Sequence, residues 1–237
     1  MFLGNTLRGV FHRPFRARLI IEQMEHIGVR SVPVITISSL AIGMIFSLQI
    51  VDLLGIFNAE VIAGSAVAWT LSRELAPVIT TLMLIGKNGS AMAAELGSMR
   101  VTEQIDAMET MSVDPVQYLV VPRLLASVVM FPALTALANV VGVSGAYAVA
   151  VWGLDVDSAA YLSTMFRDVD PKDVLSGIVK AGIMGFIVAV ICTYYGYYAE
   201  NGAKGVGESS TRAVVTSSIS ILVADYVLAS IMLALIY

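Results

Sequence analysis

Long apolar runs without a charged residue constrain this chain more than any other feature. Residues 31–51, 124–151 and 181–199 each lack Asp, Glu, Lys and Arg. A helix needs about 20 such residues to cross roughly 30 Å of hydrocarbon. The whole chain is 57% hydrophobic and 14% charged, and its mean hydropathy is +0.83. This balance excludes an ordinary soluble domain and predicts an all-α integral membrane protein, since the alternating ten-residue strands of a membrane barrel do not occur.

Five membrane spans are predicted, and Lys180 lies at the entrance of the charge-free part of the fourth. The spans cover residues 31–57, 61–86, 118–151, 176–199 and 213–237. Residues 1–30 form a separate basic segment, which we expect to lie on the membrane surface as an amphipathic helix. Its basic residues are Arg8, Arg13, Arg16, Arg18 and Arg30. Residues 31–237 then make one transmembrane domain, with a polar loop at residues 87–117 between the second and third spans.

The distribution of Lys and Arg predicts the orientation, because cytoplasmic loops hold an excess of basic residues. With the amino terminus inside, most loop cations fall on the inner side. The loop between the third and fourth spans keeps only Arg167 and Lys172, among five aspartates at positions 155, 157, 168, 170 and 173. We therefore expect a cytoplasmic amino terminus, an acidic external loop and an external carboxyl terminus.

Charges inside the spans indicate where function lies. Arg73 and Glu74 fall near the middle of the second span, where an unpaired charge costs about 2.5 kcal/mol or more. Adjacent helical residues point about 100° apart, so at least one of the two must meet another helix or a polar cavity. Two readings stay open: a structural ion pair, or a substrate cavity loosened by Pro77 in the next turn. Asp225 in the fifth span has serines in neighbouring turns as hydrogen-bond donors, which favours a structural role.

An apolar face on the first span is the candidate wall of such a cavity. Phe46, Ile50, Leu53, Leu54 and Phe57 recur at i, i+4, i+7, i+8 and i+11 and share one helical face. An apolar face of a membrane helix ordinarily contacts lipid or another helix. This face lines a cavity only if a cavity beside Arg73 opens next to it.

The loop at residues 87–117 is too polar for lipid, yet its apolar residues recur near helical spacing. Met92, Leu96, Met99, Ile105 and Met108 alternate with acidic and basic residues. This pattern predicts one or two cytoplasmic helices with an adaptable, methionine-rich docking face. The pair Asp114–Pro115 ends them before the third span.

The sequence lacks the motifs of nucleotide-binding, metal-binding and catalytic sites. No G-x-x-x-x-G-K-[ST] phosphate loop occurs, and GKNGS at residues 86–90 lacks its spacing. His12 and His26 belong to no metal-ligand pattern, and Cys192 is the one thiol. The chain is therefore predicted to be non-catalytic and to bind no metal or cofactor.

Three motifs carry a resemblance to a known family. ELAPV, GKNGSAMAAELGSMRVTEQIDAMETMSVDP and VPRLLA resemble the MlaE family of ABC transporter permeases. The resemblance covers roughly residues 25–237 and is strongest over residues 72–123. The loop is also similar to that of ABC importers generally, with Glu103, Leu119 and Pro122 in the expected places but Glu109 where importers have glycine.

The resemblance implies a homodimeric permease in the bacterial inner membrane. Such a permease moves phospholipids or related lipids between that membrane and a periplasmic MCE-domain shuttle, and so maintains outer-membrane lipid asymmetry. Two cytoplasmic ATPase subunits use the ATP and Mg²⁺, and nucleic acid is not a partner. The direction of transport and the exact lipid stay open.

The resemblance also implies two sets of site residues. The ATPase-coupling set is Glu95, Gly97, Arg100, Glu103, Asp106 and Glu109. The lipid-binding set is Arg73, Glu74, Leu75, Phe46, Leu53, Leu54 and Phe57.

Two other functions compete with this one. A secondary transporter or channel would use Arg73, Glu74 and Asp225 as a charge relay. The small number of spans and the absence of an evident inverted repeat weigh against it. A purely structural membrane scaffold is the third possibility, for which changes in the pocket would not alter lipid flux.

Overall fold

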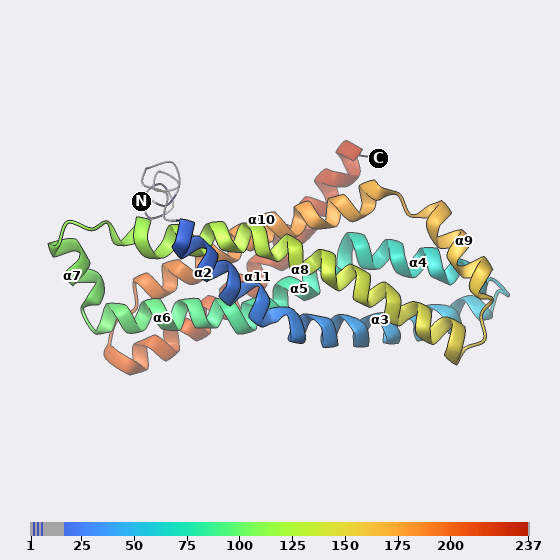
Figure 1. Cartoon of the computed structure of the whole chain (residues 1–237), viewed down its shortest axis with the longest axis horizontal. Helices are drawn as coiled ribbons and strands as arrows, with labels where there is room; N and C mark the ends of the chain where they lie inside the picture. The colour runs from blue at the N-terminus through green and yellow to red at the C-terminus, as the bar shows by residue number, and fades with distance from the viewer. Residues whose placement is uncertain (1, 3, 5, 7–16, 237) are drawn as a thin grey trace.

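The computed structural model of the chain describes residues 2, 4, 6 and 17–236. These residues are 90% helical and contain no strand, so the predicted all-α class is confirmed. The principal helices are α2 (Ala17–Ile27), α3 (Val32–Gly55), α4 (Ala63–Thr70), α5 (Ala76–Leu84), α6 (Ser90–Val101), α7 (Gln104–Thr110), α8 (Val121–Ala148), α9 (Ser158–Asp168), α10 (Pro171–Tyr197) and α11 (Gly202–Ile236). Figure 1 shows an elongated bundle with α7 at one end and α9 at the other.

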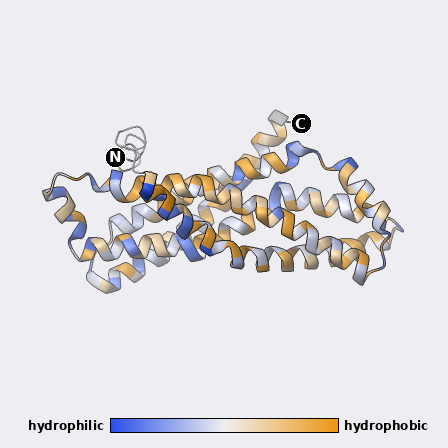
Figure 2. Cartoon of the chain, viewed as in Figure 1, coloured by the Kyte–Doolittle hydropathy of each residue, from blue (hydrophilic) through white to orange (hydrophobic). Residues whose placement is uncertain are grey.

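Four helical segments of the described chain are long and apolar enough to cross a membrane. They are Ala17–Gly55, Val116–Gly153, Pro171–Tyr197 and Gly202–Ala234. Hydrophobic residues follow these helices along the bundle, and hydrophilic ones are more frequent toward its two ends (Figure 2). An integral membrane protein is the architecture that this distribution supports.

The predicted second span is built differently from the other four. It consists of α4 and α5, joined by the π-helical turn η3 (Leu71–Leu75), and it ends in a second π-helical turn, η4 (Ile85–Gly89), which leads into α6. This run leads from the α9 end of the bundle toward the α7 end (Figure 1). It is not among the four apolar segments, because Arg73 and Glu74 lower its hydropathy.

Small residues set the closest helix contacts. A Cβ atom on Gly43 of α3 would lie 2.0 Å from the carbonyl oxygen of Gly142 on α8, so only glycine fits there. Gly145 approaches α3 in the same way, with the Leu40 carbonyl oxygen 2.9 Å from its would-be Cβ. Gly43, Gly142 and Gly145 therefore let α8 pack closely against α3 within one chain.

The amino-terminal helix α2 packs on the bundle through one face. Ile27 is fully buried and Met24 packs against the main core, whereas Arg18 and Glu22 form an exposed ion pair at 3.1 Å. Of the predicted basic surface segment, Arg8, Arg13 and Arg16 lie outside the described residues, as does His12.

The GKN motif at residues 86–88, just before α6, forms hydrogen bonds to the connection between α2 and α3. Lys87 Nζ donates to the Arg30 carbonyl oxygen at 2.5 Å and to Ser31 Oγ at 2.9 Å. Asn88 Nδ2 donates to the Ile27 carbonyl oxygen at 3.1 Å and to Ser31 Oγ at 3.0 Å. These bonds satisfy carbonyl groups that the helix end leaves open. The motif therefore stabilises the contact between these helices and does not form a phosphate-binding loop.

Asn88→Ala should lower the free energy of unfolding by about 1–3 kcal/mol, because Asn88 is 1% exposed and the variant loses its two buried hydrogen bonds, to the Ile27 carbonyl oxygen and to Ser31 Oγ. Thermal unfolding of the purified protein in mild detergent measures this change. Gln104→Ala on the exposed surface of α7 is the control and should leave the unfolding temperature unchanged. Equal unfolding temperatures for both variants would contradict the structural task of the motif.

Candidate functional site

The π-helical turn η3 presents Arg73 and Glu74 to the neighbouring helices. Pro77 lacks a backbone N–H, so it cannot donate to the Arg73 carbonyl oxygen four residues earlier. Lys180 Nζ of α10 donates to that oxygen instead, at 3.3 Å. Single π-helical turns frequently occur at functional sites, where they aim side chains away from the regular helical positions. The sequence prediction that Pro77 loosens the helix here is consistent with this geometry.

Gly177 brings α10 into direct contact with this turn. A Cβ atom at Gly177 would lie 2.0 Å from the Ser72 carbonyl oxygen. Asp173 and Lys180 lie on either side of Gly177 along α10, one toward each end of the helix. Arg73 Nη1 lies 3.7 Å from Asp173 Oδ1, and Glu74 Oε2 lies 2.5 Å from Lys180 Nζ. The close approach therefore pairs both charges of the turn with charges of α10.

Lys180 joins three helices through one ammonium group. Its Nζ is 2.5 Å from Glu74 on η3 and 2.8 Å from Asp225 Oδ1 on α11, and its side chain is 1% exposed. The charge-free run begins only at Ala181, but α10 already begins at Pro171, so Lys180 lies well inside this helix. Two carboxylates therefore share the one buried amine of Lys180.

Asp173 is the second residue whose role the sequence analysis missed. The sequence predicts that Asp173 lies in the acidic external loop, but Asp173 is 2% exposed and lies in the first turn of α10. Asp173 Oδ2 accepts a hydrogen bond from the backbone N–H of Asp170 at 3.0 Å, as part of a capping box with Pro171 next to the cap. The sequence D-P-K-D is typical of such a helix start and could have revealed it.

Asp225 has a different partner from the one expected. Serines of neighbouring turns were the predicted donors, but the carboxylate contacts Lys180. Ser217 lies 3.4 Å from Cys192 Sγ, and Ser230 donates to the Tyr226 carbonyl oxygen. Asp225 thereby becomes part of the same charge cluster as Arg73 and Glu74.

We call Arg73, Glu74, Asp173, Lys180 and Asp225 the charge cluster. Two cations face three carboxylates, which leaves one negative charge in excess. The cationic side chains are the covered ones, with Arg73 11% and Lys180 1% exposed, whereas Glu74 is 40% exposed. The surface of the cluster that other molecules can reach is therefore carboxylate.

The predicted apolar wall on the first span is divided between core and surface. Phe46 packs with Leu75 against Val67 and Leu71, and Leu54 packs against the cluster around Tyr161. Leu53 and Phe57 are exposed. The five positions share a helical face, but the neighbouring helices cover only part of it.

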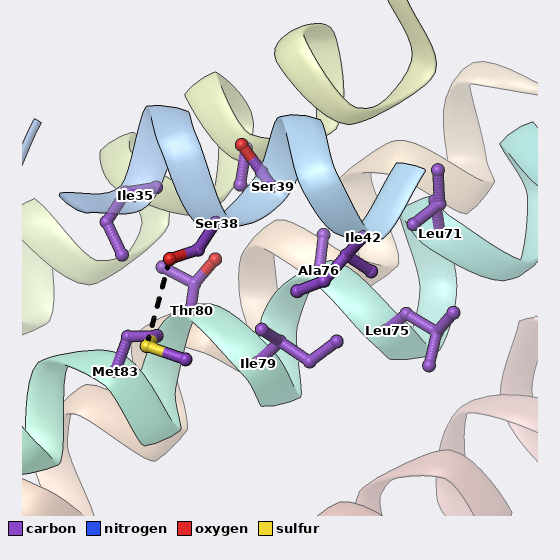
Figure 3. Close-up of a pocket in the computed structure, with 11 residues that line it drawn as sticks. Ile35, Ser38, Ser39, Ile42, Leu71, Leu75, Ala76, Ile79, Thr80 and Met83 are labelled. Carbon is purple, nitrogen blue, oxygen red and sulfur yellow. Dashed lines mark hydrogen bonds between the residues drawn. The ribbon is translucent and has the colours of Figure 1, made fainter. Parts of the chain in front are cut away.

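A groove between α3 and α5 lies beside this wall. It encloses about 310 Å³ including its open mouth, and its apolar lining comes mainly from Ile35, Ile42, Leu71, Leu75 and Ile79. Figure 3 shows Ser38 of α3 facing Met83 of α5 across the groove. Of the predicted lipid-binding residues, Leu75 is the one that lines it. Its apolar lining is of the kind that an acyl chain contacts.

Comparison with known proteins identifies the family. The family described as Permease MlaE matches residues 20–231. The chain belongs to the MlaE permease family. A probable ABC transporter permease protein of Rickettsia felis is 42% identical over 228 residues, which cover 96% of this chain and 88% of that protein. The intermembrane phospholipid transport system permease protein MlaE of Haemophilus influenzae is 38% identical over 215 residues, covering 90% and 82%. The chloroplastic protein TRIGALACTOSYLDIACYLGLYCEROL 1 of Arabidopsis thaliana is 38% identical over 229 residues, covering 96% and 65%.

As an MlaE permease, the chain is the membrane subunit of an ABC transporter and is not itself catalytic, because a partner ATPase hydrolyses ATP. The predicted non-catalytic role is thereby confirmed.

The predicted coupling residues of this permease occupy α6, α7 and their junction. Arg100 of α6 forms an ion pair with Asp106 of α7, which holds the two helices at an angle. Glu103 lies between them with a φ of 60°, a left-handed conformation that a non-glycine residue adopts infrequently, and its side chain is exposed. This junction forms part of the α7 end of the bundle (Figure 1).

The remaining coupling residues attach α6 and α7 to the spans. Glu95 Oε2 lies 2.9 Å from the guanidinium of Arg123 on α8, and Tyr197 at the end of α10 donates to Glu109 at 3.1 Å. A Cβ at Gly97 would lie 3.2 Å from Ala199 Cβ. Arg123, which the sequence analysis did not select, is the buried anchor of this arrangement and is 7% exposed.

Proposed function

We propose that this chain is the permease of an ATP-driven transporter that moves phospholipids or related lipids between the inner membrane and a periplasmic MCE-domain shuttle, and so maintains outer-membrane lipid asymmetry. Family membership carries the proposal, together with the intermembrane phospholipid transport named for the Haemophilus relative. The acyl chains lie on apolar walls such as the groove between α3 and α5, and the headgroup lies near Arg73. The predicted lipid-binding set, Arg73, Glu74, Leu75, Phe46, Leu53, Leu54 and Phe57, remains part of the proposal.

The α7 end faces the cytoplasm and the α9 end faces the periplasm in this proposal, with the amino terminus inside and the carboxyl terminus outside. The support is the excess of Lys and Arg on the segments at the α7 end. Two ATPase subunits dock against α6 and α7, and bind the ATP and Mg²⁺ that this chain does not. A second copy of the chain completes the membrane unit, and the MCE-domain partner lies at the α9 end.

A continuous run of chain connects the two proposed sites. The docking helix α6 leads through η4 and α5 directly to η3, which carries Arg73 and Glu74. Helix α6 also packs against α10 and α11, the helices that carry Lys180 and Asp225. A displacement of α6 by the ATPase therefore reaches the charge cluster along packed helices. Closure of the ATPase dimer would narrow the lipid site and expel the lipid.

Arg73→Glu should abolish lipid transfer while the complex still assembles, because it places a carboxylate against Asp173 and reverses the charge near the headgroup. Lipid transfer by the purified complex in proteoliposomes, with copurification of the ATPase, measures both properties. Arg73→Lys keeps the charge and should retain part of the activity.

Arg18→Glu is the control, because Arg18 carries the same charge on α2, away from both proposed lipid sites, and its side chain is 91% exposed. Wild-type transfer by Arg73→Glu would overturn the assignment of the lipid site. Transport that continues without ATPase and follows an ion gradient would instead favour the secondary transporter.

A further inference from the structure

A hollow at the α9 end of the bundle lies outside the groove between α3 and α5. It encloses about 530 Å³ including its open mouth. Four of its lining residues, Ile62, Ser65, Ala66 and Trp69, recur at helical spacing on one face of α4 and the turn before it, and Asp168 closes it from the end of α9. Hollows of this size hold groups as large as a lipid headgroup.

The wall of the hollow is held firmly in place. Thr164 Oγ1 of α9 donates to the Val61 carbonyl oxygen at 2.9 Å. A Cβ at Gly64 would lie 2.8 Å from the Tyr161 carbonyl oxygen, and Tyr161 is fully buried. These contacts fix α9 against α4, so Asp168 is positioned before any ligand arrives.

The hollow adjoins the charge cluster through Trp69. The guanidinium carbon of Arg73 lies over the Trp69 ring, 4.6 Å from its centroid, and 46% of Trp69 remains exposed. A ligand in the hollow therefore touches the same indole that Arg73 covers. A phosphate near Arg73 and a second charged group in the hollow can belong to one headgroup.

The charged group that lines the hollow is the carboxylate of Asp168, which is paired with the 73% exposed side chain of Arg167. Asp168 is 37% exposed and Glu74 is 40% exposed, whereas the cations of the charge cluster are covered. Arg167 forms hydrogen bonds to Asp168 at 2.8 and 3.3 Å, and these lower the pKa of the Asp168 carboxyl, which keeps it ionised. Arg167 itself is not among the residues that line the hollow. A carboxylate accepts about four hydrogen bonds, so Asp168 retains acceptor capacity for a ligand.

We infer that this hollow binds the ammonium group of a zwitterionic phospholipid headgroup, with Asp168 as the counter-ion and Trp69 and Ser65 as the wall. The inference rests on the proposed function and adds the class of lipid. A carboxylate beside an aromatic ring is a favourable environment for an ammonium group. An anionic headgroup would instead add a second negative charge beside a cluster that already has one in excess. Phosphatidylethanolamine is therefore preferred over phosphatidylglycerol.

The test uses the complete complex, with its ATPase and partner subunits, in proteoliposomes that hold equal amounts of phosphatidylethanolamine and phosphatidylglycerol. Mass spectrometry of the transferred lipid gives the ratio of the two. We expect the wild-type complex to prefer phosphatidylethanolamine by about tenfold, the range of a hydrogen bond to a charged group. Asp168→Asn should reduce this ratio to nearly one, and Trp69→Leu should also lower it.

Asp155→Asn is the matched control, because Asp155 is exposed at the same end and Asn tolerates its φ of 54°. It should keep the wild-type ratio. Equal transfer of both lipids by the wild-type complex would overturn the inference and leave the proposed function intact, as would an unchanged ratio in Asp168→Asn. Failure of the wild-type complex to transfer either lipid would overturn the proposed function itself.

Discussion

Lys180→Met should destabilise the folded protein by about 3 kcal/mol, because it leaves the mostly buried carboxylate of Asp225 and the half-buried one of Glu74 without their shared cation. The ammonium of Lys180 lies 2.5 Å from Glu74 and 2.8 Å from Asp225, and the side chain is 1% exposed. Burying an uncompensated carboxylate costs more than the original ion pair contributed. Thermal unfolding in mild detergent, followed by size-exclusion chromatography of the folded fraction, measures the loss.

Lys172→Met is the matched control for this change. Lys172 is the second residue of the same helix and is exposed. It should leave the unfolding temperature unchanged. A triple variant that combines Lys180→Met with Glu74→Gln and Asp225→Asn should recover much of the lost stability, because no uncompensated charge remains. Wild-type stability of Lys180→Met alone would show that these three charges do not form a buried network.

Gly177→Ala should abolish most lipid transfer and destabilise the protein by about 1–3 kcal/mol, the cost of inserting a methyl group into a filled contact. The new Cβ would lie 2.0 Å from the Ser72 carbonyl oxygen, so α10 must move away from η3. That movement separates Arg73 from Asp173 and Glu74 from Lys180 together. Transfer by the reconstituted complex and thermal unfolding of the permease give the two effects.

Gly182→Ala on the same helix is the control for Gly177→Ala. Its Cβ would meet Pro132 Cγ at 3.4 Å and the Val128 carbonyl oxygen at 3.8 Å, both ordinary contacts. We expect near wild-type transfer for this variant. If both alanine variants behaved alike, the close approach at Gly177 would have no special part in holding the charge cluster.

The candidate site was partly predictable from the sequence. Arg73 and Glu74 stand out because charged residues within an apolar run are costly, and Pro77 marks the turn that carries them. Asp173 could have been added from the D-P-K-D helix start. Lys180 could not be assigned in this way, because a lysine beside an apolar run has the same local pattern whether it lies at the membrane surface or deep in a bundle.

The sequence by itself determined the properties that depend on local composition and period. The charge-free runs required membrane helices, the polar run at residues 87–117 required helices outside the hydrocarbon, and three motifs placed the chain in its family. The tertiary structure alone decided which distant side chains meet. Glycine at position 177 lets α10 approach η3, and only then do Asp173 and Lys180 reach Arg73 and Glu74. The contacts of a charge across helices depend on helix rotation and separation, which follow from packing over the whole bundle and not from the neighbouring residues in the chain.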